Sequence, residues 1–182
     1  MATGVDFHVR PASPADVQAI HELIVVSARE LSRNYYDDAQ VEAAIAHVFG
    51  VDSTLIADGT YFVMEAEGVI RGCGGWSKRR TLFGGDQYAS RDVGFSDPTT
   101  DSAKIRAFFV HPQSARKGIA RALLARCESE AINAGYTQAE LMSTLPGEQF
   151  YRVCGYVSSA AMNVIVGGVD LRFVPMAKPL RL

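Results

Sequence analysis

The segment VHPQSARKGIA, residues 110–120, combines a proline, two adjacent basic residues and a glycine. The hydrophobic run IRAFFV precedes the turn, and ARALLARCESEAINAG follows it with apolar residues at helical spacing. The first amide N–H groups of a helix have no intrahelical partner, and the helix dipole places partial positive charge there. Arg116, Lys117 and Arg121 add three formal positive charges. The segment therefore predicts a strand–turn–helix anion site suited to phosphate, the alternative being a plain helix start on a solvated basic surface.

Two widespread phosphate motifs do not fit this turn. The nucleotide-triphosphate loop requires GxxxxGK[ST], which the chain lacks. The dinucleotide motif requires GxGxxG after a strand, whereas SARKGIARA contains one glycine. GCGGWS follows a strand pattern, but it lacks the third glycine at the required spacing and no helix pattern follows it.

A third pattern does fit. The segment resembles the central motif of GNAT-type N-acetyltransferases, in which a strand ending V-x-P is followed by R/Q-x-x-G-x-G/A at the start of a helix. VHP matches the first part and GIA matches the last. Ala115 stands where the pattern has Arg or Gln, and Arg116 occupies the next position.

The resemblance continues in STLPGEQFYRVCGY. This stretch is similar to the family's second segment, N-A-x-x-F-Y-x-x-x-G-F/Y, through Phe150, Tyr151, Gly155 and Tyr156. Pro146 stands where the family often has Asn, a contact to the pantetheine arm. The order of predicted strands and helices also matches along nearly the full chain.

The resemblance implies acetyl-CoA as co-substrate, with no metal. The pantetheine arm would insert beside a splayed strand, and the pyrophosphate would rest on the amides of the turn. The CoA-binding residues that the resemblance implies are Phe108, Val110, Arg116, Lys117, Gly118, Ile119, Ala120 and Arg121. The implied reaction is direct transfer of the acetyl group from the thioester to a primary amine.

Acetyl transfer needs a polarised carbonyl oxygen, a proton for the departing thiolate and an amine that has lost its proton. The backbone N–H near Phe108 would serve the first need. The resemblance places Tyr151 for the second, the alternative being a Tyr that packs in the core beside Phe150.

The base is left open by the sequence. Glu65 shares a strand face with Tyr61 and Val63 and would act through water, but it also fits an exposed residue on an antiparallel strand. The other candidates are Asp86, Tyr88, Asp92, His111 and Glu140. Of these, His111 is expected to face solvent, and Glu140 also fits a sheet edge.

The elements that must position these residues follow from periodicity. A strand at residues 7–10 precedes a helix capped by Ser13, and Asp37 and Asp38 open a second helix. TYFVMEA and VIRGCGGWS form a hairpin about Glu67 and Gly68, with glycines that mark a bulge or a close backbone approach. Two hydrophobic strands flank the helix after the turn, and a short helix and a closing hairpin complete the chain.

The helix after the turn links two strands as a βαβ crossover, so these strands are expected to be parallel. With the antiparallel hairpins, this predicts an α/β fold in one domain over residues 1–182. Together with the resemblance, the fold class is a GNAT-like mixed, mostly antiparallel sheet with a central parallel splayed strand pair and helices on both faces. The aperiodic segment 79–103 is either part of the acceptor site or a lid over it, or a disordered surface excursion.

The overall composition limits the kinds of binding partner that the protein is expected to have. The 182 residues carry a net charge of −2 with a pI of about 6.1, which argues against nucleic acid or a membrane surface as partner. Cys73, Cys127 and Cys154 form no CxxC pair, as expected of reduced thiols in a cytoplasmic protein. No signal peptide and no apolar run of about 18 residues is recognisable.

The predicted function is an acetyl-CoA-dependent N-acetyltransferase acting on a small-molecule or protein amine. Two alternatives are a non-catalytic acyl-CoA-binding or regulatory domain of the same fold, and an unrelated phosphate-binding α/β domain. Tyr151 favours the enzyme, since a sensor needs no acid for a leaving group. The acceptor and the oligomeric state, including a homodimer, are left open.

Overall fold

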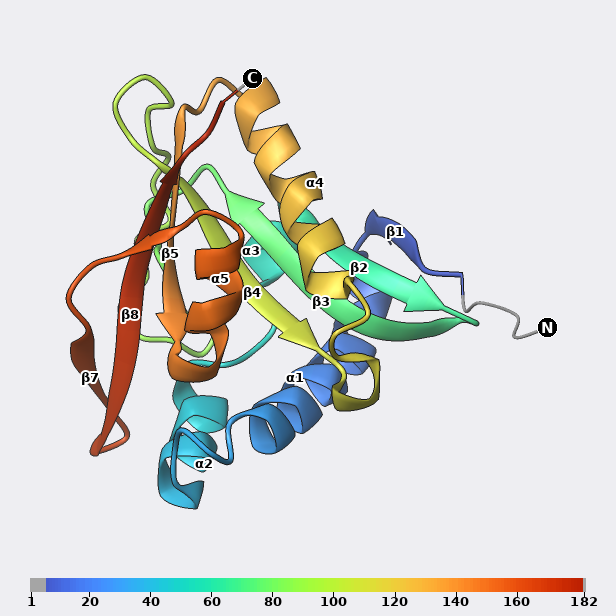
Figure 1. Cartoon of the computed structure of the whole chain (residues 1–182), viewed down its shortest axis with the longest axis vertical. Helices are drawn as coiled ribbons and strands as arrows, with labels where there is room; N and C mark the ends of the chain where they lie inside the picture. Colours follow the sequence, from blue (N-terminus) through green and yellow to red (C-terminus); the bar gives the residue numbers. More distant parts are fainter. Residues whose placement is uncertain (1–5, 182) are drawn as a thin grey trace.

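The sheet of the computed structural model, which describes residues 6–181, has eight strands in the order β1-β2-β3-β4-β5-β8-β6, with β7 paired to β8 (Figure 1). Only the β4–β5 pair is parallel, so the predicted mixed and mostly antiparallel sheet is confirmed. The strands are β1 (His8–Pro11), β2 (Tyr61–Ala66), β3 (Val69–Ser77), β4 (Ala103–Val110), β5 (Gln138–Thr144), β6 (Val157–Ser158), β7 (Met162–Val166) and β8 (Val169–Pro179).

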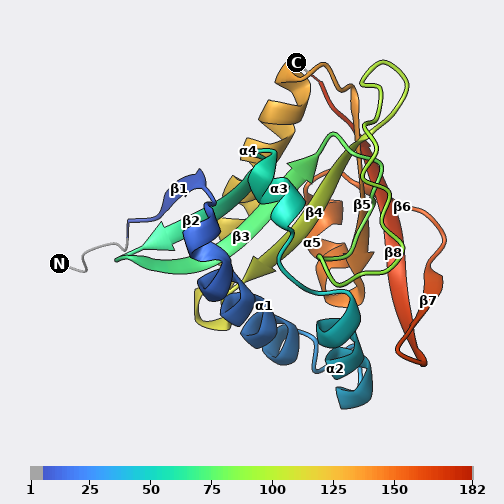
Figure 2. The ribbon, with the colours of Figure 1, turned by 180° about the vertical axis from the view of Figure 1, so that it is seen from behind.

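Helices cover both faces of the sheet, as predicted. One face carries α1 (Val17–Leu31), α2 (Asp38–His47) and α3 (Ser53–Ala57), and the other carries α4 (Ile119–Asn133) and α5 (Glu148–Val153) (Figures 1 and 2). The sequence did not predict α3, because one helical turn shows no periodicity. Within residues 6–181, no helix is long and apolar enough to cross a bilayer.

The predicted helix starts are built by side-chain caps. The Ser13 amide donates to Asp16 Oδ2 at 2.7 Å, which opens a 3₁₀ turn ahead of α1. Asp37 Oδ1 accepts from the Gln40 amide at 2.8 Å at the start of α2, and the Gln40 side chain accepts from the Asp37 amide at 3.0 Å. Both satisfy N–H groups that the first helical turn leaves unpaired.

The sheet separates two hydrophobic cores. One lies under α4 and α5, and the other lies under α1 and α2. Ile20, Ile24 and Ala28 of α1 are buried as the helical spacing predicts. Val17 and Leu31, expected on the same face, are each 39% exposed because they occupy the two ends of the helix.

The glycines of β3 let neighbouring elements approach the strand closely, as predicted. A Cβ at Gly72 would lie 2.5 Å from Ile119 Cγ2, where α4 crosses the sheet. A Cβ at Gly74 would lie 2.7 Å from the ring of Phe108. These two positions therefore let α4 and the Phe108 ring seat against the strand.

Candidate active site

The two parallel strands separate soon after they meet. β4 and β5 pair only through Ala103 with Ala139 and Lys104 with Glu140, and the side chains of the second pair form an ion pair. The strands then diverge toward Val110 and Thr144, which confirms the splayed pair. Beyond Lys104, the backbone groups of β4 that face β5 have no strand partner, so an extended ligand can pair with them.

A bulge in β4 changes which side chains face which helices. Ala107 has φ = 56°, and the register with β3 moves from Arg106–Gly75 to Phe109–Cys73, so β4 has one more residue than β3 between these pairs. The Tyr61 hydroxyl donates to the Ala107 carbonyl at 3.2 Å. Non-glycine residues with positive φ are sparsely populated and cluster at functional sites.

The bulge reverses the alternation along the strand. Ile105 packs in the α4 core before the bulge, as do Phe108 and Val110 after it. Ala107 and Phe109 pack in the α1–α2 core. One strand therefore supplies walls to spaces on both faces of the sheet.

The turn between β4 and α4 presents free backbone amides. Arg116 has φ = 63°, and Gly118 has φ = 83° as the N-cap of α4. No amide of residues 116–121 is hydrogen-bonded to another backbone group of the described chain, and the first such bond of the helix runs from the Ala122 amide to the Gly118 carbonyl at 3.0 Å. A Cβ at Gly118 would have no atom within 4 Å, so this backbone is open to a ligand.

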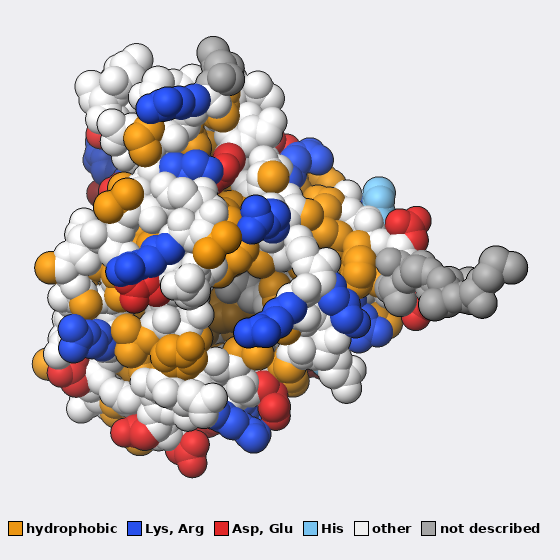
Figure 3. Space-filling model, in the orientation of Figure 1, with side chains coloured by type: hydrophobic (Ala, Val, Ile, Leu, Met, Phe, Trp, Pro, Cys, Tyr) orange, Lys and Arg blue, Asp and Glu red, His pale blue; other side chains and the backbone are white. Residues whose placement is uncertain are grey.

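A cleft of about 240 Å³ lies between the diverging strands, and Figure 3 shows this face hollowed near its centre, with hydrophobic side chains inside and Lys and Arg side chains around the opening. It is lined by both strands, by α1 and the start of α4, by α5 and by the segment after β3. The lining residues are Ser27, Ala28, Leu31, Ser32, Val48, Phe49, Gly50, residues 82–85, residues 105–110, Ala120, residues 142–144, Pro146, Gly147, Phe150, Tyr151 and Phe173.

Tyr151 lies in this cleft with an uncommitted hydroxyl. Its ring packs edge-on against Phe108 and Phe150, with centroids 6.3 and 5.0 Å away. No hydrogen bond joins the hydroxyl to another of residues 6–181, and burial raises the pKa of Tyr151 above its ordinary value. The hydroxyl is therefore protonated at neutral pH.

A family model described as an acetyltransferase (GNAT) domain matches residues 77–180. This chain belongs to the GNAT acetyltransferase family. The match covers the splayed strands, the turn before α4 and the α5 segment, which are the parts that carried the resemblance in the sequence. A comparison with curated proteins finds no match.

Solved GNAT structures share the fold over nearly the whole chain. A GCN5-related N-acetyltransferase from Rhodopseudomonas palustris superposes with a TM-score of 0.73 at 20% identity, covering 99% of this chain and 100% of that one. YncA from Salmonella typhimurium, determined with its cofactor acetyl-CoA, gives 0.63 at 19% identity, over 96% and 94%. The ribosomal-protein-S18-alanine N-acetyltransferase from Escherichia coli gives 0.60 at 14% identity, over 97% and 96%. Such identities establish a common fold.

The turn and the cleft contain the residues that the resemblance assigns to CoA binding. Phe108, Val110 and Ala120 line the cleft, so they lie where the sequence places them. Arg116, Lys117 and Arg121 are exposed around the helix start, beside the free amides. Ile119 is turned into the core, so its amide alone faces the turn. Their role in CoA binding stays a prediction.

Glu65 is placed away from the cleft. Its carboxylate accepts from Arg10 Nε at 2.9 Å, where β1 pairs with β2, and it is not among the lining residues. The structure therefore does not bring Glu65 together with Tyr151, and we do not retain it as the base. Glu65 lies on the same strand as Tyr61, whose hydroxyl donates to the Ala107 carbonyl at the bulge.

The five other candidates for the base also have structural partners. Asp86 pairs with Arg91 at 2.8 Å, Asp92 caps the Gly94 amide at 2.9 Å, and His111 Nδ1 accepts from the Gln113 amide at 3.3 Å. Tyr88 stacks on Phe83, and Glu140 pairs with Lys104. None of the five lines the cleft, and residues 6–181 contain no cluster of three or more Asp, Glu, His or Cys side chains that would hold a metal.

The segment after β3 contributes to the cleft through a feature that the sequence did not reveal. Residues 82–85 line it, and the Gly84 carbonyl accepts from Arg106 at 2.6 Å. Arg106 and Arg91 both pair with Asp52, at 2.6 and 2.9 Å. The exposed fractions of the Arg106 and Asp52 side chains are 2% and 0%, so this buried charge network fixes the segment to the protein interior.

The network joins three distant parts of the chain. Asp52 caps α3, Arg106 lies on β4 and Arg91 belongs to the aperiodic segment. Spacing along the chain carries no signal for such a contact, although a charged residue inside the hydrophobic run IRAFFV is a cue that a buried partner exists. Residues 82–85 of the segment therefore form part of the cleft wall, and the role of the segment in the acceptor site or as a lid stays a prediction.

Proposed function

We propose that this GNAT acetyltransferase transfers the acetyl group of acetyl-CoA to an amine. The observation that carries the proposal is the continuity of the cleft. Its lining runs from Ala120, at the start of α4, past the unpaired edge of β4 to the hydroxyl of Tyr151. An extended thioester with a phosphate at one end and an acetyl group at the other matches this arrangement.

The turn would hold the pyrophosphate and β4 would hold the arm. Free amides of residues 116–121 supply hydrogen-bond donors at the positive end of the α4 dipole. Backbone groups of Phe108 and Val110 on the splayed edge would pair with the pantetheine amides as a neighbouring strand does. These contacts would bring the thioester beside Phe108 and Tyr151.

The chemistry would proceed by direct attack. The amine nitrogen forms a bond to the carbonyl carbon, and negative charge builds on the carbonyl oxygen, where the Phe108 amide next to the bulge would stabilise it. The carbon–sulfur bond then breaks, and the electron pair leaves on sulfur. Tyr151 would give that thiolate its hydroxyl proton, and the proton lost by the nitrogen would pass through water to the tyrosinate and restore the tyrosine.

Incubation with acetyl-CoA and a panel of amines tests the proposal, with intact-mass detection of a product heavier by one acetyl group. Acetyl-CoA should also stabilise the fold, since a ligand at one hundred times its dissociation constant adds about 2.7 kcal/mol when it binds only the native state. A thermal shift without any acetylated amine would favour the non-catalytic binding domain. The absence of both at millimolar acetyl-CoA would contradict the proposed function altogether.

A further inference from the structure

The acceptor side of the cleft contains no side chain that would accept a proton or balance a cation. All lining residues fall within the described part of the chain, and they include no Asp, Glu, His or Lys. Arg106 is the single charged residue among them, and its charge is balanced by Asp52. An ammonium ion entering this space would lose water and gain no counter-ion.

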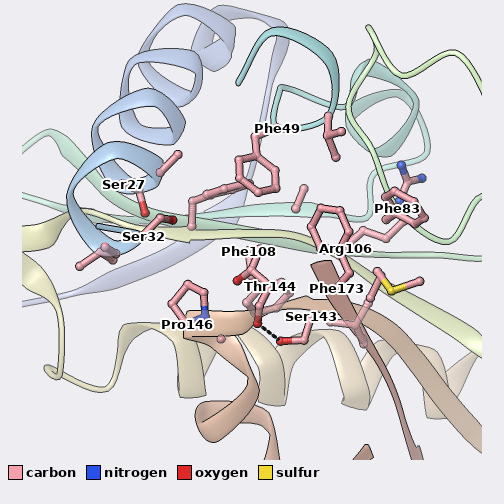
Figure 4. A pocket seen from close by; sticks show the side chains of 18 of the residues that line it. Ser27, Ser32, Phe49, Phe83, Arg106, Phe108, Ser143, Thr144, Pro146 and Phe173 are labelled. Atoms are coloured by element: carbon pink, nitrogen blue, oxygen red, sulfur yellow. Dashed lines mark hydrogen bonds between the residues drawn. The ribbon is translucent and has the colours of Figure 1, made fainter. Parts of the chain in front are cut away.

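The wall opposite the splayed edge is aromatic. Phe49, Phe83 and Phe173 come from three separate segments and converge on the same space (Figure 4). The Phe49 and Phe173 ring centroids lie 6.4 Å apart, and those of Phe83 and Phe173 lie 5.7 Å apart. Such a surface favours a flat apolar group.

A few hydroxyls would orient a polar end of the ligand. Ser27 and Ser32 point from α1 toward the cavity, and Ser143 and Thr144 lie across from them on β5 (Figure 4). Ser143 Oγ is committed to the Thr144 carbonyl at 2.8 Å. That bond uses the Ser143 proton and leaves its oxygen lone pairs free, so all four hydroxyls can accept a hydrogen bond from a neutral NH₂.

The protonation state of the amine decides the class. A lysine-like alkylamine has a pKa of about 10.4, so only roughly one molecule in 10³ is uncharged at pH 7. A base in the cleft would overcome this, and the lining supplies none. An aromatic amine is uncharged at neutral pH, because its nitrogen lone pair is delocalised into the ring, and it attacks without prior loss of a proton.

We infer that the acceptor is a small aromatic amine that enters the cleft uncharged. The inference rests on the proposed function, and it excludes polyamines and lysine side chains as preferred acceptors. The volume of about 240 Å³, shared with the acetyl end of the donor, suits a ligand of one or two rings.

Aniline and cyclohexylamine provide a matched test, because they share a six-membered ring and differ in basicity. At pH 7, kcat/KM for aniline should exceed that for cyclohexylamine, spermidine and a lysine-containing peptide by at least about tenfold. Between pH 6.5 and 9, kcat/KM should stay level for aniline and should rise about tenfold per pH unit for cyclohexylamine, following its free-base fraction. Equal or faster acetylation of a cationic amine at pH 7 would overturn the inference and leave the proposed function intact.

A variant pair tests the same idea through the protein. Leu31 lies at the rim of the cleft and is 39% exposed, so Leu31→Glu adds a carboxylate without burying it. It should raise the ratio of kcat/KM for cyclohexylamine over aniline about tenfold, whereas Leu31→Gln should leave that ratio unchanged. No change in Leu31→Glu would show that missing negative charge does not set the preference. CoA binding without turnover of any amine would instead contradict the proposed function.

Discussion

The turn that precedes α4 and the wall of the cleft opposite the splayed edge of β4, here called the acceptor wall, are built in opposite ways. The turn is one contiguous stretch, residues 111–121, and its binding groups are mainly backbone amides that any sequence with the right glycine would present. The wall gathers side chains from α1, the segment before α3, the segment after β3, β5 and β8, and a buried charge network holds part of it in place. In the proposed function, the turn would select the donor and the wall would select the acceptor.

This difference predicts that substitutions in the turn and in the wall have different consequences. Backbone contacts depend on conformation, so they should tolerate a change such as Ala115 at a motif position. Side-chain contacts depend on residue type, so each substitution in the wall alters the chemistry that it recognises. Variants in the two regions should therefore separate cleanly, with one group changing CoA affinity and the other changing acceptor selection.

Gly118→Val should have the largest effect of any single change. Gly118 has φ = 83°, which L side chains rarely adopt, and a side chain there would occupy the space from which the pyrophosphate approaches. Hydrogen bonds to a charged group contribute about 1.5–3 kcal/mol each, and the loss of two or more should weaken CoA binding by roughly a thousandfold. Isothermal titration calorimetry with CoA measures this.

Gly168→Val is the matched control for backbone strain. Gly168 has φ = 78° and also has no atom within 4 Å of a built Cβ, but it lies in the turn between β7 and β8. Both variants should lose similar stability, and the control alone should keep CoA affinity. Retained affinity in Gly118→Val would remove the phosphate assignment.

The contrast between the two regions also sets what the sequence could reveal. The turn and the parallel strand pair could be predicted because they belong to one contiguous strand–turn–helix–strand stretch, and the resemblance singled out Tyr151 through a second contiguous motif. Helix α3, the bulge at Ala107 and the Asp52–Arg106 pair were missed, since the first has one turn and the other two depend on contacts between distant segments. The place of Glu65 outside the lining of the cleft could not be predicted, because strand alternation gives the face of a residue and not its distance from the cleft.

Asp52→Asn should disrupt the packing of the acceptor wall and leave the turn before α4 unchanged. The substitution leaves the buried Arg106 and Arg91 without their shared counter-ion, and breaking a buried ion pair from one side destabilises a protein by about 3–5 kcal/mol. Chemical denaturation should show a loss of about 3 kcal/mol. Acceptor KM should rise because residues 82–85 lose their anchor, while CoA affinity stays unchanged.

Asp92→Asn supplies the control in the same segment. Asp92 lies 3.9 Å from Arg80, both side chains are about 60% exposed, and Asn can still cap the Gly94 amide. Its unfolding free energy should stay within about 0.5 kcal/mol of the parent. Equal losses in the two variants would mean that the buried network does not anchor the wall.

Tyr151→Phe, at the junction of the two regions, should lower kcat. The hydroxyl has no partner among residues 6–181, so its removal should not affect stability, whereas general acid catalysis is typically worth roughly 10²–10⁴ in rate. We expect kcat to fall roughly 10- to 1000-fold, with CoA affinity and Tm unchanged.

Tyr156→Phe is the matched control, since its ring lies 5.7 Å from that of Tyr151 and its hydroxyl donates to Glu128 at 3.0 Å. It should lower the unfolding free energy by about 1–2 kcal/mol and leave kcat within about twofold. A kcat for Tyr151→Phe within about twofold of the parent, with chemistry rate-limiting, would show that Tyr151 is structural.

Arg116→Ala should have the smallest effect in the turn. Its side chain is exposed, and a solvent-exposed charge contact contributes roughly 0–1 kcal/mol, so CoA affinity should fall no more than about fivefold at low salt. Screening should shrink the difference further at 1 M salt, where the Debye length is about 3 Å. Lys117→Ala should have a similarly small effect. Arg33→Ala, which lies just after the C-terminal end of α1, should leave CoA affinity unchanged. If Arg116→Ala instead matched Gly118→Val, side-chain charge rather than backbone geometry would hold the pyrophosphate. CoA binding by the turn would then depend on side chains, as acceptor binding by the acceptor wall does. Substitutions at motif positions such as Ala115 should then weaken CoA binding to a comparable extent.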